Sequence, residues 1–316
     1  MSNMENEIME QPESVKVAYE NSVEMANTAK DIISNGRNIF ITGSGTSYHS
    51  AMYLNYILDL LGINARSVQS SQISGILKNY EKQGGVLVAF SQSGESIDAL
   101  NAIKIASENN FKVIGITNSG NSKLSREADI SIVTGAGKEM AVTATKSFTA
   151  AMMASVAIYD AVTGNKTNTG ILSEGIYSIL KNKEIIDIAA RINRKTIVLG
   201  SDGMYPIALE GALKLRETDS LYAEGFPFRE YLHGYIQTLD NETSVICIND
   251  EPPGEIKKYT GNIIKIRNDV MNVKSVSGIL DPVLHIVPLQ LISLYYAGSH
   301  GLDPDKPEKL HKVVKQ

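Results

Sequence analysis

Two clusters of hydroxyl side chains, each directly after an apolar run, are the first candidates for chemistry in this sequence. GSGTS (43–47) follows the run NIFIT, and SQSGES (91–96) follows GVLVAF. Each cluster precedes a helical pattern, and the first N–H groups and partial positive charge of a helix suit an anion. For Ser47 and Ser96 the alternative is simple N-capping, a role in which serine is common. Two such loops on one edge of a parallel sheet favour a phosphate-sized cradle.

Both clusters lack the lysine of a nucleotide-binding loop. Neither GxxxxGK[ST] nor GxGxxG occurs at these turns. P-loop enzymes need that lysine because charge develops on the phosphoryl group that they transfer. Neutral donors suit a phosphate that is held as an inert handle while another part of the ligand reacts. The sequence therefore predicts a sugar phosphate as the ligand.

The candidates for proton transfer lie in the second half of the chain. EGALKLRE places Glu210, Lys214 and Glu217 on one face of a helix, and spacing alone favours a solvated face of salt bridges. His233 follows sixteen residues after Glu217, and its ordinary pKa suits proton transfer, although a lone histidine is usually structural. The histidines show no HExxH or comparable spacing, so we expect no metal site.

Composition limits the classes of function. A net charge of -5, with basic residues scattered along the chain, offers no field for nucleic acid. The single cysteine, Cys247, excludes an internal disulfide and a CxxC metal framework. The N-terminus lacks a signal-peptide core, and no apolar stretch is long enough to cross a membrane. We expect a cytoplasmic globular enzyme or binding protein.

Alternating strands and helices must position these residues. After a helix at about 13–34, apolar runs of strand length alternate with helical patterns, which is typical of a doubly wound parallel sheet. The predicted strands are 38–42, 65–69, 85–90, 112–118 and 129–134. The predicted helices between and after them are 47–61, 71–80, 96–109 and 145–162.

The second half repeats the pattern of the first. A polar linker at 163–170 precedes two helices that extend to about residue 194. KTIVLGSDGMYPIALEGALKL then echoes NIFITGSGTSYHSAMYLNYIL, and further strands are expected at 243–249 and 262–267. Duplication predicts two α/β domains of the same kind.

Six blocks of sequence, in order, resemble the isomerase half of the glutamine:fructose-6-phosphate amidotransferase (glucosamine-6-phosphate synthase) family, which is built of two sugar-isomerase (SIS) domains. The blocks are EIMEQPESV, GSGTSY, SQSGES, AGKEMAVTATKSFTA, YPIALEGALKLRE and VPLQLISLYYAGSHGLDPDKPEKLHKVV. The resemblance implies an α/β chain with two SIS domains, each a doubly wound parallel sheet flanked by helices. It implies an N-terminal helical segment (1–36), a first SIS domain that binds the sugar phosphate (37–165), a helical linker (166–194), a second SIS domain with the catalytic glutamate and histidine (195–302) and a C-terminal tail over the active site (303–316).

The resemblance also assigns roles to residues. Glu217 would carry a proton between C1 and C2 of an open-chain hexose or hexosamine 6-phosphate, and Lys214 would support the substrate hydroxyls or the enediolate. His233, contributed by the neighbouring subunit of a homodimer, would open the sugar ring, and Lys312 could form an imine at C2. No cofactor is required. The implied substrate-binding residues are Gly45, Thr46, Ser47, Ser91, Gln92, Ser93 and Ser96 near the phosphate, and Val142 and Ala144 near the sugar.

Departures from the family pattern leave the reaction open. Full synthases carry an N-terminal glutaminase domain with a cysteine nucleophile, whereas this sequence begins at the isomerase boundary. Tyr235 replaces a proline after His233, and Ala144 replaces a serine near the sugar. The leading hypothesis is an isomerase/deaminase that interconverts glucosamine 6-phosphate with fructose 6-phosphate and ammonia. The alternatives are a fructosamine-6-phosphate deglycase, an isomerase served by a separate glutaminase subunit, and a sugar-phosphate sensor without catalysis.

Overall fold

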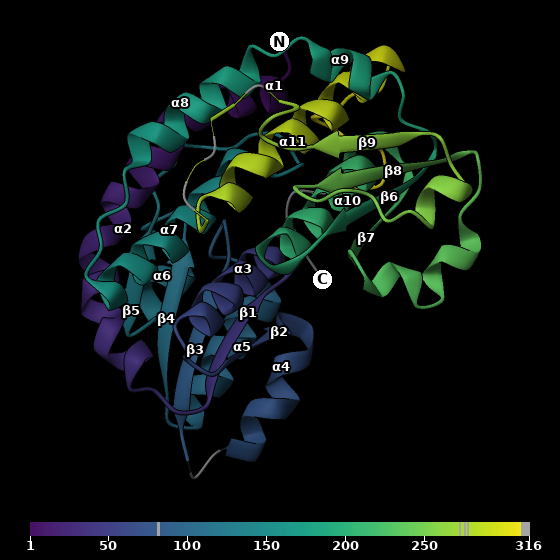
Figure 1. Ribbon diagram of the computed structural model, residues 1–316. Coiled ribbons are helices and arrows are strands. Elements are labelled where there is room, and N and C mark those ends of the chain that lie inside the picture. The colour runs from purple at the N-terminus through teal and green to yellow at the C-terminus, as the bar shows by residue number, and fades with distance from the viewer. Residues whose placement is uncertain (81–82, 272, 275, 277, 311–316) are drawn as a thin grey trace. The chain divides into compact units, whose positions relative to one another are not determined.

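The computed structural model describes residues 1–80, 83–271, 273, 274, 276 and 278–310 in two compact units (Figure 1). The five-strand unit comprises Glu13–Lys138 and Lys146–Gly170. The four-strand unit comprises Met1–Pro12, Glu139–Thr145 and the described residues from Ile171 onward. Segment 139–145 thus packs with the four-strand unit, although it lies inside the range 37–165 predicted for the first domain. The domain boundaries drawn from the sequence remain predictions.

The five-strand unit contains a wholly parallel sheet in the order β2-β1-β3-β4-β5. This is a doubly wound order, and its topological switch point, where ligands bind in such sheets, lies between β1 and β3. The apolar runs had predicted all five strands within about one residue. The strands are β1 (Ile39–Gly43), β2 (Ala65–Gln69), β3 (Gly85–Phe90), β4 (Phe111–Thr117) and β5 (Ile130–Val133).

Helices cover both faces of this sheet (Figure 1). Helices α3 and α7 pack together on one face, while α4, α5 and α6 lie over the other. Between that second face and its helices lies a buried apolar core that includes Phe40, Leu87 and Val113. The helices are α2 (Gln11–Ser34), α3 (Thr46–Leu60), α4 (Ser70–Leu77), η1 (Lys78–Tyr80), α5 (Ile97–Glu108), α6 (Lys123–Glu127) and α7 (Lys146–Thr163).

The four-strand unit repeats this topology. Its parallel sheet has the order β7-β6-β8-β9, which corresponds to β2-β1-β3-β4 and confirms two doubly wound α/β sheets. The sequence did not predict β7, because YAEGFP is an edge strand without an apolar run. The strands are β6 (Lys195–Gly200), β7 (Tyr222–Pro227), β8 (Thr243–Ile248) and β9 (Ile263–Ile266).

One glycine at the end of the first strand of each sheet shows how close the two copies are. A Cβ atom added to Gly43 would lie 2.3 Å from the carbonyl oxygen of Ser47, and one added to Gly200 would lie 2.3 Å from that of Met204. Real Cβ atoms do not approach backbone oxygens this closely. Only glycine therefore lets the strand turn so tightly into its helix in either copy.

The remaining helices belong to the four-strand unit, where α10 packs along α11. Gly211 allows the close contact between these helices, since a Cβ at this position would lie 2.6 Å from Cδ1 of Leu289. None of the helices in the described part of the chain is long and apolar enough to span a membrane. The helices are α1 (Asn3–Met9), α8 (Thr169–Leu180), α9 (Glu184–Ala189), η2 (Asp202–Met204), α10 (Tyr205–Asp219), η3 (Glu230–Leu232), η4 (Tyr235–Thr238), η5 (Ile256–Lys258) and α11 (Asp281–Ser299).

Candidate functional site

The two hydroxyl loops of the five-strand unit lie at the same edge of its sheet. β1 and β3 are neighbouring parallel strands, so the loops that follow them meet beyond their carboxyl ends, at the switch point. One loop leads into α3 through Gly45, Thr46 and Ser47. The other contains Ser91, Gln92, Ser93 and Ser96 and leads into α5. This arrangement brings hydroxyls and two helix N-termini to one edge of the sheet, a combination that suits an anion.

Hydrogen bonds fix the shape of the second loop. The backbone N–H of Gly94 donates to Oγ of Ser91 at 3.1 Å, and that of Glu95 donates to Oγ of Ser93 at 3.2 Å. Gly94 has φ of 65°, and a Cβ there would lie 2.1 Å from Oγ of Ser122. The loop is therefore closed against its neighbour and requires glycine at this position.

Simple capping does not account for the hydroxyls of Ser47 and Ser96. Ser47 is not an N-cap, because α3 begins at Thr46 and Gly45 holds the cap position. Ser96 does precede α5, yet within the described residues its side chain makes no capping hydrogen bond. Ser122, by contrast, caps α6 by accepting from the N–H of Ser125. The two candidate serines thus do not perform the structural role that was the alternative to ligand binding.

On α10 of the four-strand unit, a lysine lies between two carboxylates. The Nζ atom of Lys214 is 3.0 Å from Oε1 of Glu210 and 2.6 Å from Oε2 of Glu217. The side chains of Lys214 and Glu210 are fully buried, whereas 21% of the Glu217 side chain is exposed. The solvated face favoured by spacing alone is therefore wrong. Helix α11 covers this stretch of α10, and sequence spacing gives no sign of such a covering element.

Electrostatics keep this lysine charged. Burial lowers the pKa of the Lys214 ammonium, but the carboxylates of Glu210 and Glu217 outweigh burial and raise the pKa above its usual value. Lys214 thus serves as a fixed cation that orients Glu217, while the exposed part of Glu217 can meet a ligand. The sequence analysis placed Glu210 on the same helix face as Lys214 and Glu217 but gave it no role. Its i, i+4 spacing to Lys214 was the one sequence feature that indicated an ion pair.

A second polar cluster anchors the C-terminal turn of α10. Oγ of Ser293 lies 3.1 Å from the carbonyl oxygen of Lys214 and 3.1 Å from Oδ2 of Asp219, and Thr218 donates to the same carbonyl at 2.8 Å. Burial raises the pKa of Asp219 to about 8, against the lowering effect of the hydrogen bonds from Thr218 and Ser293. A protonated Asp219 can donate to Ser293, whose own proton then goes to the carbonyl. No sequence pattern indicates this cluster, because Ser293 and Asp219 are far apart in the chain.

We expect Asp219 to make stability depend on pH. Its folded pKa of about 8 lies above the ordinary value of about 3.9, so between these pH values the folded chain holds a proton that the unfolded chain releases. The free energy of unfolding then falls as pH rises through this window, by up to ~1.4 kcal/mol per unit. In Asp219→Asn this decline should be absent, as measured by urea unfolding from about pH 5 to about pH 8. Equal slopes in wild type and variant contradict the argument, and Asp187→Asn, at an exposed site on α9, is the control.

The other predicted site residues are His233, Val142, Ala144 and Lys312. His233 directly follows η3, and its exposed side chain makes no hydrogen bond to the described residues. Val142 and Ala144, both half-buried, belong to segment Glu139–Thr145 of the four-strand unit. Lys312 lies outside the described residues.

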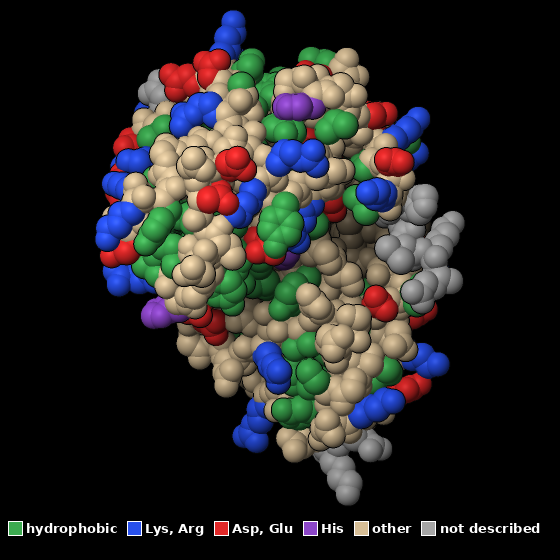
Figure 2. Space-filling view, turned by 90° about the vertical axis from the view of Figure 1, so that its right-hand side faces the viewer, with side chains coloured by type: hydrophobic (Ala, Val, Ile, Leu, Met, Phe, Trp, Pro, Cys, Tyr) green, Lys and Arg blue, Asp and Glu red, His purple; other side chains and the backbone are tan. Residues whose placement is uncertain are grey.

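Surface charge and metal ligands add two observations. On the face drawn in Figure 2, side chains of Lys and Arg are interspersed with those of Asp and Glu, so that face shows no field of one sign. In the described part of the chain, no three His, Cys, Asp or Glu side chains gather in a way that could hold a metal ion.

Comparison with known proteins identifies the family. Residues 32–161 match the model of the SIS domain. A glutamine–fructose-6-phosphate aminotransferase (isomerizing) of Pyrobaculum aerophilum is 33% identical over 348 residues, which cover 98% of this chain and 57% of that protein. The C-terminal domain of the glucosamine-fructose-6-phosphate aminotransferase of Francisella tularensis has the same fold, with a TM-score of 0.80, 26% identity, and coverage of 97% of this chain and 98% of that one. The chain is a tandem SIS-domain protein.

This tandem SIS-domain protein is homologous to the isomerase half of those aminotransferases, and it spans 57% of the length of the P. aerophilum relative. A glucosamine-6-phosphate deaminase from Thermotoga maritima shares its fold over 99% of both chains, with a TM-score of 0.80 and 24% identity. Recognition of the SIS fold from six sequence blocks is therefore confirmed.

Proposed function

We propose that this tandem SIS-domain protein interconverts glucosamine 6-phosphate and water with fructose 6-phosphate and ammonia. The observation that carries the proposal is the partly exposed carboxylate of Glu217, held 2.6 Å from the buried ammonium of Lys214. Homology to the isomerase half of the aminotransferases supports an aldose–ketose proton shift as the chemistry of that carboxylate.

The proposed reaction moves one proton between two carbons. Glu217 removes the proton from C2 of the open-chain amino sugar and returns a proton to C1, while a second proton passes from the amino nitrogen to the oxygen at C1. The aldehyde thereby becomes an alcohol and the amine becomes an imine. Water then adds to the imine carbon and ammonia leaves, which gives the ketose. A carboxylate suits this transfer, since general acid–base catalysis contributes about 10²–10⁴-fold. Lys214, fixed between two carboxylates, orients the base.

The hydroxyl loops of the five-strand unit hold the phosphate in this proposal. Ser47, Ser91, Gln92, Ser93 and Ser96 offer neutral donors at two helix N-termini, where an unreactive phosphate is stabilised without lysine. The unused capping capacity of Ser96 supports this role.

His233 and Lys312 complete the proposed machinery. In a homodimer, His233 opens the ring of the sugar bound to the neighbouring subunit. The exposed imidazole of His233 agrees with this role. Lys312 forms the imine at C2 during conversion of the ketose. Val142 and Ala144 contact the sugar, and Ala144 presents a methyl group where the family pattern has a serine hydroxyl.

Cys247 is poorly suited to release ammonia from glutamine. The one cysteine of the sequence, Cys247, is buried in β8, and burial raises the pKa of its thiol to about 12. A thiol that stays protonated is a poor nucleophile for glutamine. In the direction of amino-sugar synthesis, Cys247 is therefore not the source of ammonia.

A substrate panel with ammonia detection tests the proposal. Purified protein is mixed with glucosamine 6-phosphate, fructose 6-phosphate and a fructosamine 6-phosphate adduct of an amino acid. We expect ammonia and fructose 6-phosphate from the amino sugar. Release of free amino acid only from the adduct favours a deglycase, and tight binding without turnover of any member favours a sensor; either result overturns the proposal.

A further inference from the structure

The segment Glu139–Thr145 alternates between buried and outward-facing residues. Glu139, Ala141, Thr143 and Thr145 are buried, while Met140 is exposed and Val142 and Ala144 are half-buried. Val142 and Ala144 are thus the partly accessible residues of the segment, each between two buried neighbours. What fixes the backbone of this segment therefore fixes both proposed sugar contacts.

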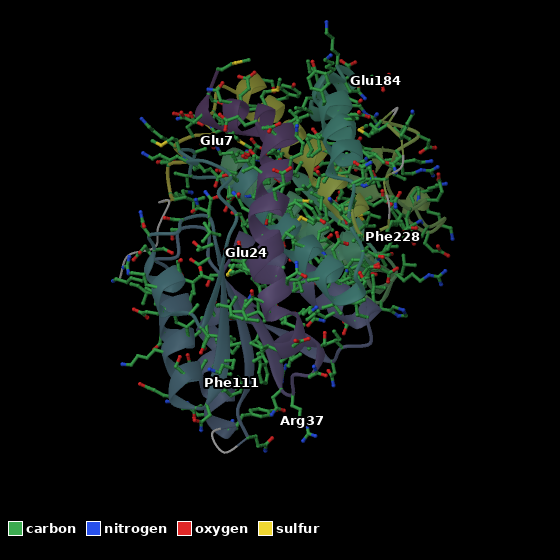
Figure 3. All side chains as sticks on the ribbon, turned by 90° about the vertical axis from the view of Figure 1, so that its left-hand side faces the viewer. Glu7, Glu24, Arg37, Phe111, Glu184 and Phe228 are labelled. Carbon is green, nitrogen blue, oxygen red and sulfur yellow. The ribbon has the colours of Figure 1, made fainter. Side chains whose placement is uncertain are left out.

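The backbone N–H groups at the start of the segment are held by one carboxylate. Met140 donates to Oε1 of Glu7, and Ala141 donates to Oε1 and Oε2 of Glu7 at 3.3 and 3.4 Å. Glu7, labelled in Figure 3, lies on α1, more than a hundred residues earlier in the chain. This residue is only 4% exposed. Hydrogen bonds from N–H groups to a buried carboxylate are charge-assisted and strong.

Asp305 ties α1 and the segment together. Its carboxylate accepts from the N–H groups of Asn3 and Met4 at 2.6 and 2.8 Å, at the N-terminus of α1. Its backbone carbonyl accepts from the N–H of Val142 at 3.3 Å. The same residue thus holds the helix that carries Glu7 and the residue proposed to contact the sugar.

The far end of the segment is fixed by amides from two helices. Nε2 of Gln290 on α11 donates to the carbonyl of Thr145 at 3.3 Å, and Nε2 of Gln11 donates to Oε1 of Gln290 at 2.8 Å. The N–H of Thr145 donates to Glu139 at 2.9 Å. Both ends of the segment are therefore anchored, and Glu7 is the charged anchor at its start.

We propose that Glu7 is a positioning residue for the sugar-binding segment. Glu7 acts through the backbone of Met140 and Ala141 to set Val142 and Ala144, and it does not touch the substrate. This inference rests on the proposed function, because it takes Val142 and Ala144 as sugar contacts. Glutamine at position 7 would keep one acceptor oxygen, replace the other with an NH₂ donor and lose the charge that strengthens these hydrogen bonds. Aspartate would keep the carboxylate on a shorter side chain.

Two readouts on Glu7→Gln test the inference. Amide hydrogen exchange at Met140 and Ala141 should accelerate at least about tenfold, the size expected for loss of a hydrogen bond to a charged group. The KM for glucosamine 6-phosphate should rise at least about tenfold while kcat changes less than about threefold, since the base itself is intact. Glu7→Asp should recover part of both effects. Glu24→Gln, at an exposed site on α2 that Figure 3 also labels, should change neither.

The outcomes separate failure of the inference from failure of the function. If wild type turns over the amino sugar and Glu7→Gln leaves either the exchange or the KM unchanged, Glu7 does not position the segment and the inference is wrong. A lower kcat with an unchanged KM would also overturn the inference, because that result indicates a smaller fraction of folded protein. If the wild-type protein turns over no sugar phosphate, the proposed function is wrong. The role of Glu7 in positioning sugar contacts is then also wrong, whatever the hydrogen-exchange rates are.

Discussion

The Glu217→Gln variant should fold, bind sugar phosphate and lose turnover by at least about 10²-fold, and by up to about 10⁴-fold. Glutamine preserves the shape of the side chain and can still contact the Lys214 ammonium, but it cannot accept the proton from C2. The measurement is kcat on glucosamine 6-phosphate together with the affinity for the unreactive sugar alcohol phosphate. Glu184→Gln, at an exposed site on α9, is the matched control and should retain full activity.

Mixed dimers extend this experiment to His233. If His233 serves the subunit beside it, Glu217→Gln and His233→Ala chains should each be inactive alone and regain part of the activity when their subunits exchange. Turnover in Glu217→Gln close to that of wild type would remove the central residue of the proposal. Hybrids that stay inactive despite demonstrated exchange would place His233 elsewhere.

Lys214→Met should lower the free energy of unfolding by about 3–5 kcal/mol, the usual cost of removing one partner from a buried ion pair. The change leaves the fully buried carboxylate of Glu210 without its cation at 3.0 Å. Glu217 suffers less because part of its side chain meets solvent. Adding Glu210→Gln to Lys214→Met should restore most of the lost stability, since the fully buried side chain at position 210 is then neutral. Urea unfolding of the two single variants and the double variant measures this coupling.

An exposed lysine provides the comparison. Lys104 lies 4.0 Å from Glu108 on α5, with both side chains more than half exposed. Such pairs contribute about 0–1 kcal/mol, so Lys104→Met should unfold almost like wild type. A Lys214→Met protein as stable as Lys104→Met would show that the α10 cluster does not hold a charged lysine.

The strands of both sheets were largely predictable, because parallel strands that are buried on both faces have continuous apolar sequences. β3 and β8 contain hardly any residue that water touches, and both were found from their composition. The sequence analysis did not predict β7, because this edge strand beside α10 contains small and polar residues in place of an apolar run. At Gly225 only a small residue fits, since a Cβ there would lie 2.7 Å from the backbone of Ala208 on α10.

The candidate site was only partly predictable. The sequence shows the spacing of residues along one helix, but it does not show which other helix packs on that face. The i, i+4, i+7 spacing of Glu210, Lys214 and Glu217 fits a solvated helix face equally well, and only α11 packed on α10 buries it. Glu7 and the segment at 139–145 are far apart in the chain, so no local pattern joins them. The helix start at Thr46, one residue before Ser47, depends on a turn that Gly45 makes with φ of 53°.

Glucosamine 6-phosphate carrying deuterium at C2 gives the most direct test of the central claim, that Glu217 carries a proton from C2. With wild-type protein, the account predicts that deuterium leaves C2 and appears at C1 of fructose 6-phosphate or in water, and that Glu217→Gln leaves the label at C2. Retention of deuterium at C2 by folded wild-type protein saturated with the amino sugar would contradict it.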